Sequence, residues 1–497
     1  IDAMSDRFVD ALIAWGDVDA IEARQHEVAR ELGFEVTDLT VFAESVRGVF
    51  EHETTFLTPR IESLPAAEVA ERMDRESLYS KLASRVHPQV AERIRQLDHP
   101  ALFIEQGSRR FYPERDLASH VLGYVDVRGE GRMGLERSFS DELSGSTVLL
   151  QRRRDVKGLD VERLSEEERA TNAGMDVHTT IDRQLQRMVE RSLERVQERS
   201  EPKAAMAVVV DVHTGDILAM ANTPTYNPNA LGADPSMRRN RVIQDAIEPG
   251  SVFKPFTMAA ALEEGAIGAE DTIDCEGGAW YVGRVRIGDD HPHGVVSAGE
   301  VIKYSSNIGS AKLALQVGAR NFLGYLGDFG FGNRTGVPLP GERRGFLRDP
   351  KTIKPIELAT TAYGQGATAT PLQLAMGIAA IANGGVRMNP RLVTRVVDEY
   401  GVPAFTQEPE PVMQVVSRET AEAVGRMMVT VTEPGGTALR ARVPGYRVAG
   451  KTGTAEKVVD GRYTSARIGS FVGYLPADDP AIAIVVVVDE PQKGSRY

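Results

Sequence analysis

Hydrophobic residues along the chain follow two different spacings, which predict a helical first part and a mixed second part. Residues 183–201 carry apolar side chains at intervals of three and four between charged ones, which predicts an amphipathic helix. Pro202 is expected to end that helix, because the residue before a proline is pushed out of helical geometry. Further upstream a similar spacing joins residues 78–94, and Pro88 is expected to divide that stretch into two helices.

After Pro202 the pattern changes to short runs of consecutive apolar residues, which predict buried strands. Residues 207–212 and 217–221 flank a His-Thr-Gly-Asp turn and are expected to form a β-hairpin. The other expected elements are helices at residues 372–382 and 421–431, and strands at residues 469–475 and 481–488. A hairpin, then helices, then returning strands predicts an α/β (α+β) fold with one central antiparallel sheet covered by helices.

Composition narrows the class of protein without identifying it. The 497 residues are 42% hydrophobic and 26% charged, which is typical of a globular chain with more than one domain. The net charge of −13 argues against an extended nucleic-acid-binding surface. The only cysteine, Cys275, leaves no intramolecular disulfide and no cysteine-based zinc site, and it is expected to be a small buried apolar residue.

Neither a membrane span nor a metal site is expected within this chain. No segment reaches the roughly 18 consecutive apolar residues that a span needs. The chain starts at Ile1 without a signal peptide, so it is interpreted as an excised soluble region. The acidic stretch at residues 289–293 holds two histidines without a clear further set of ligands, so it is interpreted as a solvated loop, and no cofactor is expected.

The first candidate for chemistry is the sequence Ser-Val-Phe-Lys at Ser251 to Lys254. Residues three apart share a helix face, and Pro255 is compatible with a helix that begins near Ser251. Serine needs a base to become a good nucleophile, and a lysine buried beside another cation has a lowered pKa that frees its amine. Alone, this spacing is more often found on a surface helix, and a second copy at residues 200–203 is attributed to chance.

The second candidate is the pair Ser305 and Asn307, which flank one residue. In a turn both side chains can face one cleft, where the hydroxyl can relay a proton and the carboxamide can hold a substrate amide. The alternative is that this segment caps a helix over residues 308–317.

The third candidate is the run Lys451, Thr452, Gly453 and Thr454, which is expected to be an exposed strand. Gly453 allows another backbone to approach closely, and Thr452 and Thr454 should point to one face. With the charge of Lys451, this suits a site that binds a peptide as an added strand and grips its terminal carboxylate. The alternative is a threonine-rich edge strand without a binding function.

The three patterns together are far more specific than any one of them. The order Ser-x-x-Lys, Ser-x-Asn, Lys-Thr-Gly closely matches the set in class A β-lactamases and penicillin-binding proteins. From about Ser77 to the end, the chain resembles class B penicillin-binding proteins. The resemblance outside the motifs rests on residues 110–113, 120–125, 134–136, 179–182, 226–229, 371–375 and 434–438, the last of which resembles a loop near the active site. Residues 363–366 and 476–491 resemble the division (septal) branch more than the elongation branch.

This resemblance implies a penicilloyl-serine transferase, or β-lactamase-like, fold for residues 203–497 on an elongated, dimerisation-like pedestal formed by residues 1–202. It implies a D,D-transpeptidase that cross-links peptidoglycan: Ser251 is acylated by the D-Ala-D-Ala end of a stem peptide, and the amine of a second strand attacks the ester. The resemblance implies that Lys254 is the general base and that Ser305, helped by Lys451, shuttles the proton. Asn307 is implied as a catalytic-site amide, and the N–H groups of Ser251 and Thr454 as the oxyanion hole. The implied substrate-binding residues are Thr452, Gly453 and Thr454.

The resemblance also implies ligands, partners and a location. β-Lactams should acylate the same serine. A SEDS-type glycosyltransferase and other division proteins are the expected partners, at the extracytoplasmic face of the bacterial membrane. A single N-terminal anchor is expected but is absent from this chain, and the family's Arg-Gly-x-Ile-x-Asp-Arg segment is missing, which leaves the first ~70 residues unassigned. The family usually continues past the last strand into a helix, so a shortened C-terminus is expected at Tyr497.

Two other classes of function stay open on the sequence alone. A β-lactamase or D,D-carboxypeptidase needs a positioned water and a base for deacylation, and no motif for these was found. A β-lactam sensor or a division scaffold would keep an idle site, which the intact motifs and the large pedestal argue against. The persistence of a penicillin adduct separates the first class from a transpeptidase, and the growth of cells that carry Ser251→Ala separates the second.

Overall fold

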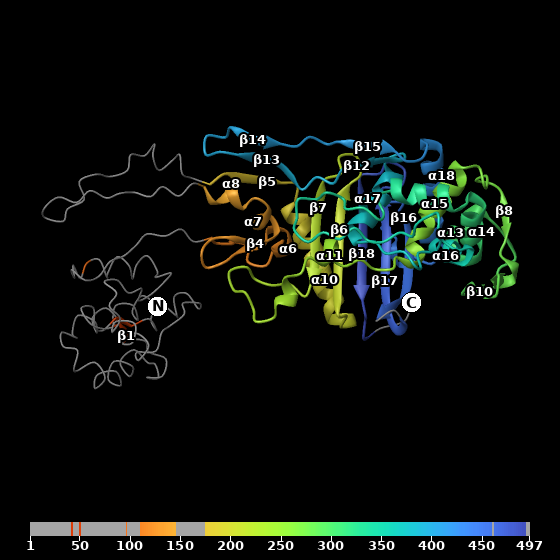
Figure 1. The fold of residues 1–497 in the computed structure, drawn as a ribbon, viewed down its shortest axis with the longest axis horizontal. Helices are drawn as coiled ribbons and strands as arrows, with labels where there is room; N and C mark the ends of the chain where they lie inside the picture. Colours follow the sequence, from red (N-terminus) through yellow and green to blue (C-terminus); the bar gives the residue numbers. More distant parts are fainter. Residues whose placement is uncertain are drawn as a thin grey trace. The chain divides into compact units, whose positions relative to one another are not determined.

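The structure is a computed structural model that describes residues 110–145, 174–459 and 462–493, with Gln96 and two short strands, β1 (Val41–Phe42) and β2 (Val49–Phe50). The chain divides into two compact units, Ile1–Phe111 and Tyr112–Tyr497. In the first unit β1 and β2 pair in antiparallel fashion. The helices expected over residues 78–94 lie outside the described residues, so the description below concerns the second unit (Figure 1).

A five-stranded antiparallel sheet forms the centre of the second unit (Figure 1). Its strands, in spatial order, are β16 (Ala449–Val459), β17 (Arg462–Leu475), β18 (Ile482–Asp489), β6 (Ala204–Asp211) and β7 (Ile217–Thr223). The expected hairpin is formed by β6 and β7, and the expected returning strands are β17 and β18. β16 lies at one edge of this sheet. Within the described part of the chain, no further strand pairs with the outer side of its backbone.

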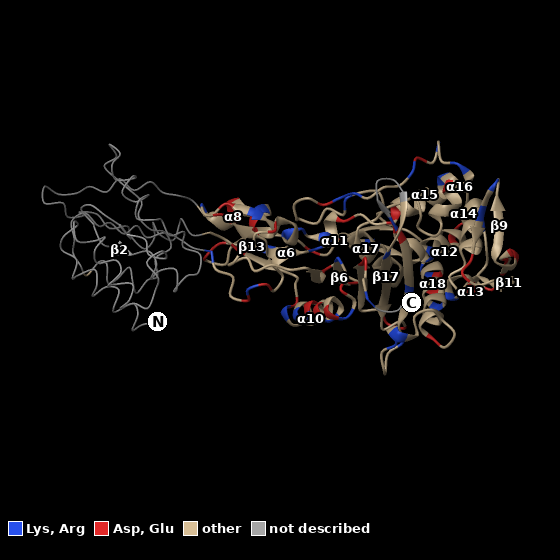
Figure 2. Cartoon of the chain, turned by 90° about the horizontal axis from the view of Figure 1, so that it is seen from below, with Lys and Arg blue, Asp and Glu red and all other residues tan. Residues whose placement is uncertain are grey.

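Alternate residues of β6 point to two different hydrophobic layers, as the pleat of a strand requires. Met206 and Val208 belong to the main core, whereas Ala207 and Val209 pack with the residues that α10 (Arg183–Ser200) buries. The ribbon of α10 carries both basic and acidic residues, which Figure 2 colours blue and red. The amphipathic helix expected over residues 183–201 is therefore confirmed, and it covers one face of the sheet.

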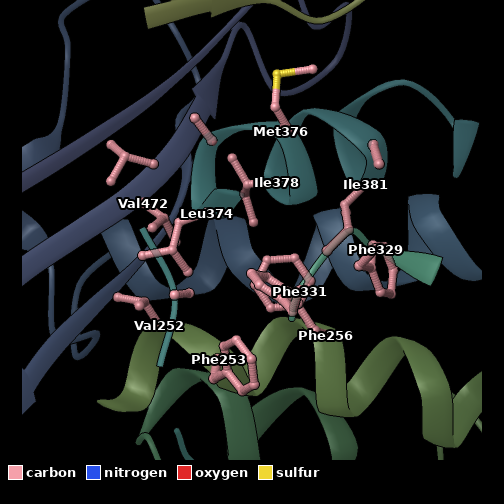
Figure 3. Packing of buried hydrophobic residues seen from close by; sticks show 14 of the residues in the cluster. Val252, Phe253, Phe256, Phe329, Phe331, Leu374, Met376, Ile378, Ile381 and Val472 are labelled. Carbon is pink, nitrogen blue, oxygen red and sulfur yellow. The ribbon is translucent and has the colours of Figure 1, made fainter. Parts of the chain in front are cut away.

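Three helices supply most of the layer on the other face: α12 (Lys254–Glu263), α17 (Pro371–Ala382) and α18 (Arg418–Thr432). Four phenylalanine rings fill the space between α12 and α17, where Phe253 and Phe331 have ring centroids 4.6 Å apart (Figure 3). Phe→Ala changes in such a core typically cost about 3–5 kcal/mol. This packing anchors the first turn of α12, and the expected fold of a central antiparallel sheet covered by helices is confirmed.

Shorter elements surround these layers. They are α6 (Ser119–Leu122), β3 (Tyr124–Val125), β4 (Gly131–Met133), α7 (Gly134–Ser138), α8 (Ser140–Ser144), β5 (Asp176–Thr179), η4 (Pro235–Arg238), α11 (Arg241–Gln244), η5 (Gly250–Phe253), β8 (Thr272–Asp274), η6 (Glu276–Gly278), β9 (Ala279–Val282), β10 (Val285–Gly288), β11 (Val295–Ser297), α13 (Ala298–Lys303), α14 (Asn307–Val317), α15 (Ala319–Asp328), α16 (Pro355–Thr361), β12 (Val386–Met388), β13 (Val393–Val397), β14 (Pro403–Thr406), β15 (Pro411–Gln414) and η7 (Leu439–Ala441). None of the described helices is both long and apolar enough to cross a membrane.

Residues 226–229, which the sequence singled out, tie the segment around α6 to the loop that follows β7. The Tyr226 hydroxyl donates to the Ser119 carbonyl at 2.8 Å. The Asn229 amide accepts from the Tyr112 N–H at 3.0 Å and donates to its carbonyl at 2.7 Å. His120 is buried in the same contact, and burial lowers its pKa to about 4, so it is neutral at physiological pH. These contacts fix α6 beside β7 and η4.

Candidate active site

Ser251 lies in the short turn η5, one turn before α12 begins at Lys254. Gly250 adopts φ 60, which glycine tolerates without strain. Pro255 fits in the first turn of α12, where its missing N–H has no partner to lose. The Ser251 side chain is half-buried and makes no hydrogen bond to any residue that the structure describes, which leaves its hydroxyl available for reaction.

A strap formed by residues 364–369 holds the chain just before Ser251. Ile247 and Ala369 exchange two backbone hydrogen bonds, at 3.0 and 2.9 Å, and the Gly250 N–H donates to the Gly364 carbonyl at 3.1 Å. A Cβ atom on Gly364 would lie only 2.3 Å from the Gly250 carbonyl oxygen, so only glycine permits this contact. Residues 363–366, whose sequence indicated only a branch of the family, therefore contain the glycine that holds the turn before Ser251.

Strand β16 lies against the other side of this turn. A Cβ atom on Gly453 would lie 2.9 Å from a methyl carbon of Val252 and 3.1 Å from the Pro249 carbonyl. The close backbone approach expected at Gly453 is thus made by the serine turn itself. Ser251 is held between the strap and β16, next to the Lys451–Thr454 run.

The Lys254 amine is at the centre of a polar cluster and is almost completely buried, with 1% exposure. It donates to the Ser305 carbonyl, to the Ser305 hydroxyl at 3.0 Å and to the Asn307 side-chain oxygen at 2.8 Å. Burial, and then the charge of Lys451, lower the pKa of Lys254 well below its ordinary value. A lowered pKa makes it easier for this lysine to lose its proton and then to take one from a neighbouring hydroxyl.

Ser305 connects the two lysines of the site. Its hydroxyl oxygen lies 3.0 Å from the Lys254 nitrogen and 3.0 Å from the Lys451 nitrogen. Its φ of 62 is in the left-handed region, which costs a serine about 1–3 kcal/mol. This strained conformation turns both the carbonyl and the hydroxyl of Ser305 toward Lys254. A hydroxyl between two amines can accept a proton from one and pass its own to the other.

The helix cap that the sequence offered as an alternative is also present, but it uses a different residue. The hydroxyl of Ser306 accepts from the Gly309 N–H at 3.0 Å and caps α14. Asn307 is the first residue of α14, and its amide donates to the Gly288 carbonyl at 2.8 Å, which directs its oxygen toward Lys254. Capping and the candidate chemistry therefore share the segment without competing.

The interpretation of residues 289–293 as a solvated loop is wrong for Asp289. Its carboxylate accepts from the Asn307 N–H and the Ser306 hydroxyl, both at 2.6 Å, and from the Ile308 N–H at 3.0 Å. An anion at a helix N-terminus satisfies otherwise unpaired donors. The expected burial of Cys275 is confirmed, and the Ser306 hydroxyl also lies 3.2 Å from its sulfur. Within the described residues, no three His, Cys, Asp or Glu side chains gather as a metal site would require.

Lys451 is fully buried, with 0% exposure, although the run was expected to be an exposed strand. Its nitrogen donates to the Ser305 hydroxyl and to the Thr452 carbonyl, each at 3.0 Å. Burial lowers the pKa of Lys451 to about 7, against a smaller opposing effect of Asp290. Only Thr452, half-buried, and Thr454, exposed, present side chains from this run to solvent.

The structure adds Thr437 to the site. Its hydroxyl lies 2.9 Å from that of Thr452, so the loop at residues 434–438 contacts the Lys-Thr-Gly strand directly. The resemblance placed this loop near the active site without giving it a role. The bond fixes the orientation of one of the two threonine hydroxyls that face outward from β16.

The candidate active site therefore brings Lys254, Ser305 and Lys451 together from three separate segments, with Ser251 three residues before Lys254. The family model for the penicillin-binding protein transpeptidase domain matches residues 205–497, which is more than half of the chain. The chain belongs to the penicillin-binding protein family. The model for the penicillin-binding protein dimerisation domain matches residues 17–179 of the same chain. The resemblance to class B penicillin-binding proteins is confirmed.

Individual relatives agree with this assignment. This penicillin-binding protein is 34% identical over 465 residues to the probable peptidoglycan D,D-transpeptidase PenA of Neisseria meningitidis serogroup A, covering 90% of this chain and 78% of PenA. It is 34% identical over 418 residues to the peptidoglycan D,D-transpeptidase FtsI of Escherichia coli K12, covering 84% and 68%. Penicillin binding protein 3 of Mycobacterium tuberculosis has a TM-score of 0.68 at 32% identity, over 78% of this chain and 85% of that one. That protein has also been solved with aztreonam bound.

Proposed function

We propose that this penicillin-binding protein is a peptidoglycan D,D-transpeptidase that cross-links stem peptides through an acyl-enzyme on Ser251. The relatives named peptidoglycan D,D-transpeptidases support the reaction. The observation that carries the assignment is the Ser305 hydroxyl, which lies 3.0 Å from both lysine nitrogens, one of which belongs to Lys254, three residues after Ser251. This arrangement supplies a base for the serine and a return route for its proton.

In the acylation step, the free amine of Lys254 takes the proton of Ser251 as the serine oxygen attacks the carbonyl of the penultimate D-Ala. The N–H groups of Ser251 and Thr454 stabilise the negative oxygen of the tetrahedral intermediate. The C–N bond then breaks, and the terminal D-Ala leaves as an amine. Its proton comes from Lys254 through the Ser305 hydroxyl, with Lys451 as the second partner of that hydroxyl.

In the second step, the amine of another stem peptide attacks the ester, Lys254 takes its proton, and the Ser251 oxygen departs and is reprotonated. A β-lactam enters through the first step, since attack on its ring carbonyl forms the same ester. Its leaving amine stays tethered by the ring atoms and blocks the acceptor position. The proposed result is a long-lived adduct, which would inhibit the enzyme.

Substrate is proposed to bind along β16 as an added strand, because β16 is the edge of the sheet. The hydroxyls of Thr452 and Thr454 would donate to the terminal carboxylate. The buried Lys451 would add positive potential from behind the strand, without a direct ion pair. Gly453 would leave room for the serine turn that carries the reacting oxygen.

The further assignments concern organisation and place. Residues 203–497 are proposed as the catalytic domain and residues 1–202 as a pedestal, at the extracytoplasmic face of the bacterial membrane. Similarity to FtsI and the resemblance of residues 363–366 and 476–491 support a role in cell division. A SEDS-type glycosyltransferase is the proposed partner.

Intact mass spectrometry after incubation with benzylpenicillin tests the proposed acyl-enzyme. One adduct of one drug molecule is expected, and digestion should place it on the peptide that contains Ser251. The adduct should outlast removal of the free drug, because the ester has no acceptor. An unmodified protein, or a modified peptide without Ser251, would refute the proposal, and rapid loss of the adduct would favour a hydrolase.

Thr437→Val is expected to slow acylation by penicillin modestly, by about 2- to 10-fold, the equivalent of one net hydrogen bond. The change removes the partner of the Thr452 hydroxyl while keeping the shape of the side chain. Stopped-flow measurement of the acylation rate checks it, with Thr394→Val as the control, because Thr394 makes its hydrogen bond to His178 on a different sheet. Equal rates for both variants would show that the Thr437 contact has no catalytic effect.

A further inference from the structure

The loop of residues 289–294, between β10 and β11, carries a histidine, His293, that the mechanism above does not use. Most residues of this loop are exposed, but its backbone is held in place. The Asp289 N–H donates to the Gly278 carbonyl at 3.2 Å. Pro292 packs closely on the same glycine, because a Cβ atom on Gly278 would lie 2.8 Å from the Pro292 Cα atom. The loop therefore has a defined position beside the active site.

His293 stacks on the aromatic ring of Tyr304. The two ring centroids are 4.6 Å apart and the ring planes differ by 14°. Both side chains are half-buried, and the Tyr304 hydroxyl donates to the Glu300 carboxylate at 3.4 Å. Stacked rings attract each other beyond the area that they bury. Since Tyr304 directly precedes Ser305 in the chain, this contact holds the backbone on one side of the proposed proton relay.

The same loop also holds the backbone on the other side of Ser305. The Asp289 carboxylate accepts from the Ser306 hydroxyl and from the Asn307 N–H, both at 2.6 Å. The loop of residues 289–294 thus contacts both the residue before Ser305 and the residue after it.

Ser305 ends α13 in a conformation that most often belongs to glycine. Its N–H donates to the Ile302 carbonyl at 3.3 Å, and the Ser306 N–H donates to the Val301 carbonyl at 3.0 Å. These two bonds form the Schellman motif of a helix end, in which the left-handed position is usually glycine, because a Cβ atom is disfavoured there. Ser305 occupies this position with φ 62. A glycine would offer no hydroxyl to the two lysines, so the surroundings must hold a serine in this conformation.

We infer that His293 is a positioning residue, which keeps Ser305 in its left-handed conformation by stacking on Tyr304. Asp289 of the same loop holds the residue after Ser305, so the two contacts act from both sides. This inference rests on the proposed acylation of Ser251, in which the Ser305 hydroxyl carries the proton to the leaving amine. A small displacement of reacting groups can slow a reaction by about 100-fold.

Stopped-flow acylation of the full chain by benzylpenicillin tests the role of the ring. His293→Ala should lower the acylation rate constant by about 10- to 50-fold and change the dissociation constant of the drug less than about threefold. The variant should still reach one adduct per molecule at long times, because it keeps every reacting group. His293→Phe keeps a ring that can stack on Tyr304, so its rate constant should stay within about threefold of wild type.

A double-mutant cycle tests whether His293 acts through Tyr304. Tyr304→Ala should slow acylation to a similar extent, and the double variant His293→Ala, Tyr304→Ala should be no slower than the slower single variant. His291→Ala is the matched control, since His291 is an exposed histidine two positions earlier in the same loop. It should react at the wild-type rate.

Several results would overturn the role of His293. They are wild-type kinetics for His293→Ala, a His293→Ala protein that never reaches one adduct, an equal loss in His293→Phe, an equal loss in His291→Ala, and multiplied losses in the double variant. Failure of the wild-type protein to form an adduct would instead overturn the proposed function, so the two failures are distinguishable.

Discussion

Lys254→Arg is expected to slow acylation of Ser251 by about 10³- to 10⁴-fold, even though it keeps a cation at this position. Arginine stays protonated at every usable pH, so it cannot take the proton of Ser251. The lysine can do so because burial and the nearby Lys451 lower its pKa. Stopped-flow acylation by benzylpenicillin measures the loss, and Ser251→Ala, which should form no adduct at all, gives the zero level.

A second variant guards against the possibility that arginine is too large for the buried position. Lys254→Met has similar length and no polar head, and it should be equally inactive while circular dichroism shows an intact fold. Lys312→Met is the matched control, because the Lys312 amine pairs with Glu276 outside the candidate site. If Lys254→Arg kept more than about a tenth of the wild-type rate, the positive charge would be the functional property and the general-base role would be refuted.

The parts of the fold that the sequence predicted depend on local rules. The hairpin of β6 and β7 follows from two apolar runs and a glycine-containing turn. Helix α10 follows from its apolar stripe. Asp182 caps its start, since the Asp182 side chain accepts a hydrogen bond from the Leu185 N–H. Its end near Pro202 is also local. The strands at the C-terminus were predicted from their apolar runs, but the pattern could not say that β18 pairs with β6, because pairing between distant strands depends on the whole sheet.

The parts of the site that the sequence missed depend on contacts between distant segments. Asp289 was assigned to a solvated loop, because nothing near it in the sequence shows that it caps α14. The burial of Lys451 was missed for a similar reason: α13 and α14 place Ser305 over a strand that lies far along the chain. The left-handed backbone of Ser305 runs against the preference of serine, and a residue held against its preference is typical of a functional site.

The site motifs were recognisable because each one names the type of side chain that the chemistry requires. Ser251, Lys254 and Lys451 have roles that few other residues can fill, and the structure brings all three to Ser305 or to the adjoining turn. Thr437 acts, in our proposal, through its contact with Thr452, and many residue types could supply such a contact. For that reason its role became visible only with the three-dimensional arrangement.

Gly364→Ala is expected to destabilise the catalytic unit and to displace Ser251, with a loss of stability about 1–3 kcal/mol greater than that of a matched control, Gly336→Ala. Both glycines have positive φ, 78 and 86 respectively, so an alanine at either position carries the same backbone penalty of roughly 1–2 kcal/mol. At Gly336 an added Cβ meets no atom within 4 Å, whereas at Gly364 it would lie 2.3 Å from the Gly250 oxygen and 2.6 Å from its nitrogen. The difference between the two variants therefore isolates the close contact of the strap with the turn that carries Ser251.

Thermal unfolding measures the stability of the two glycine variants. The rate of acylation by penicillin reports on the position of Ser251, and this rate should fall in Gly364→Ala alone. Equal melting temperatures and equal acylation rates for the two variants would show that the strap does not position the nucleophile.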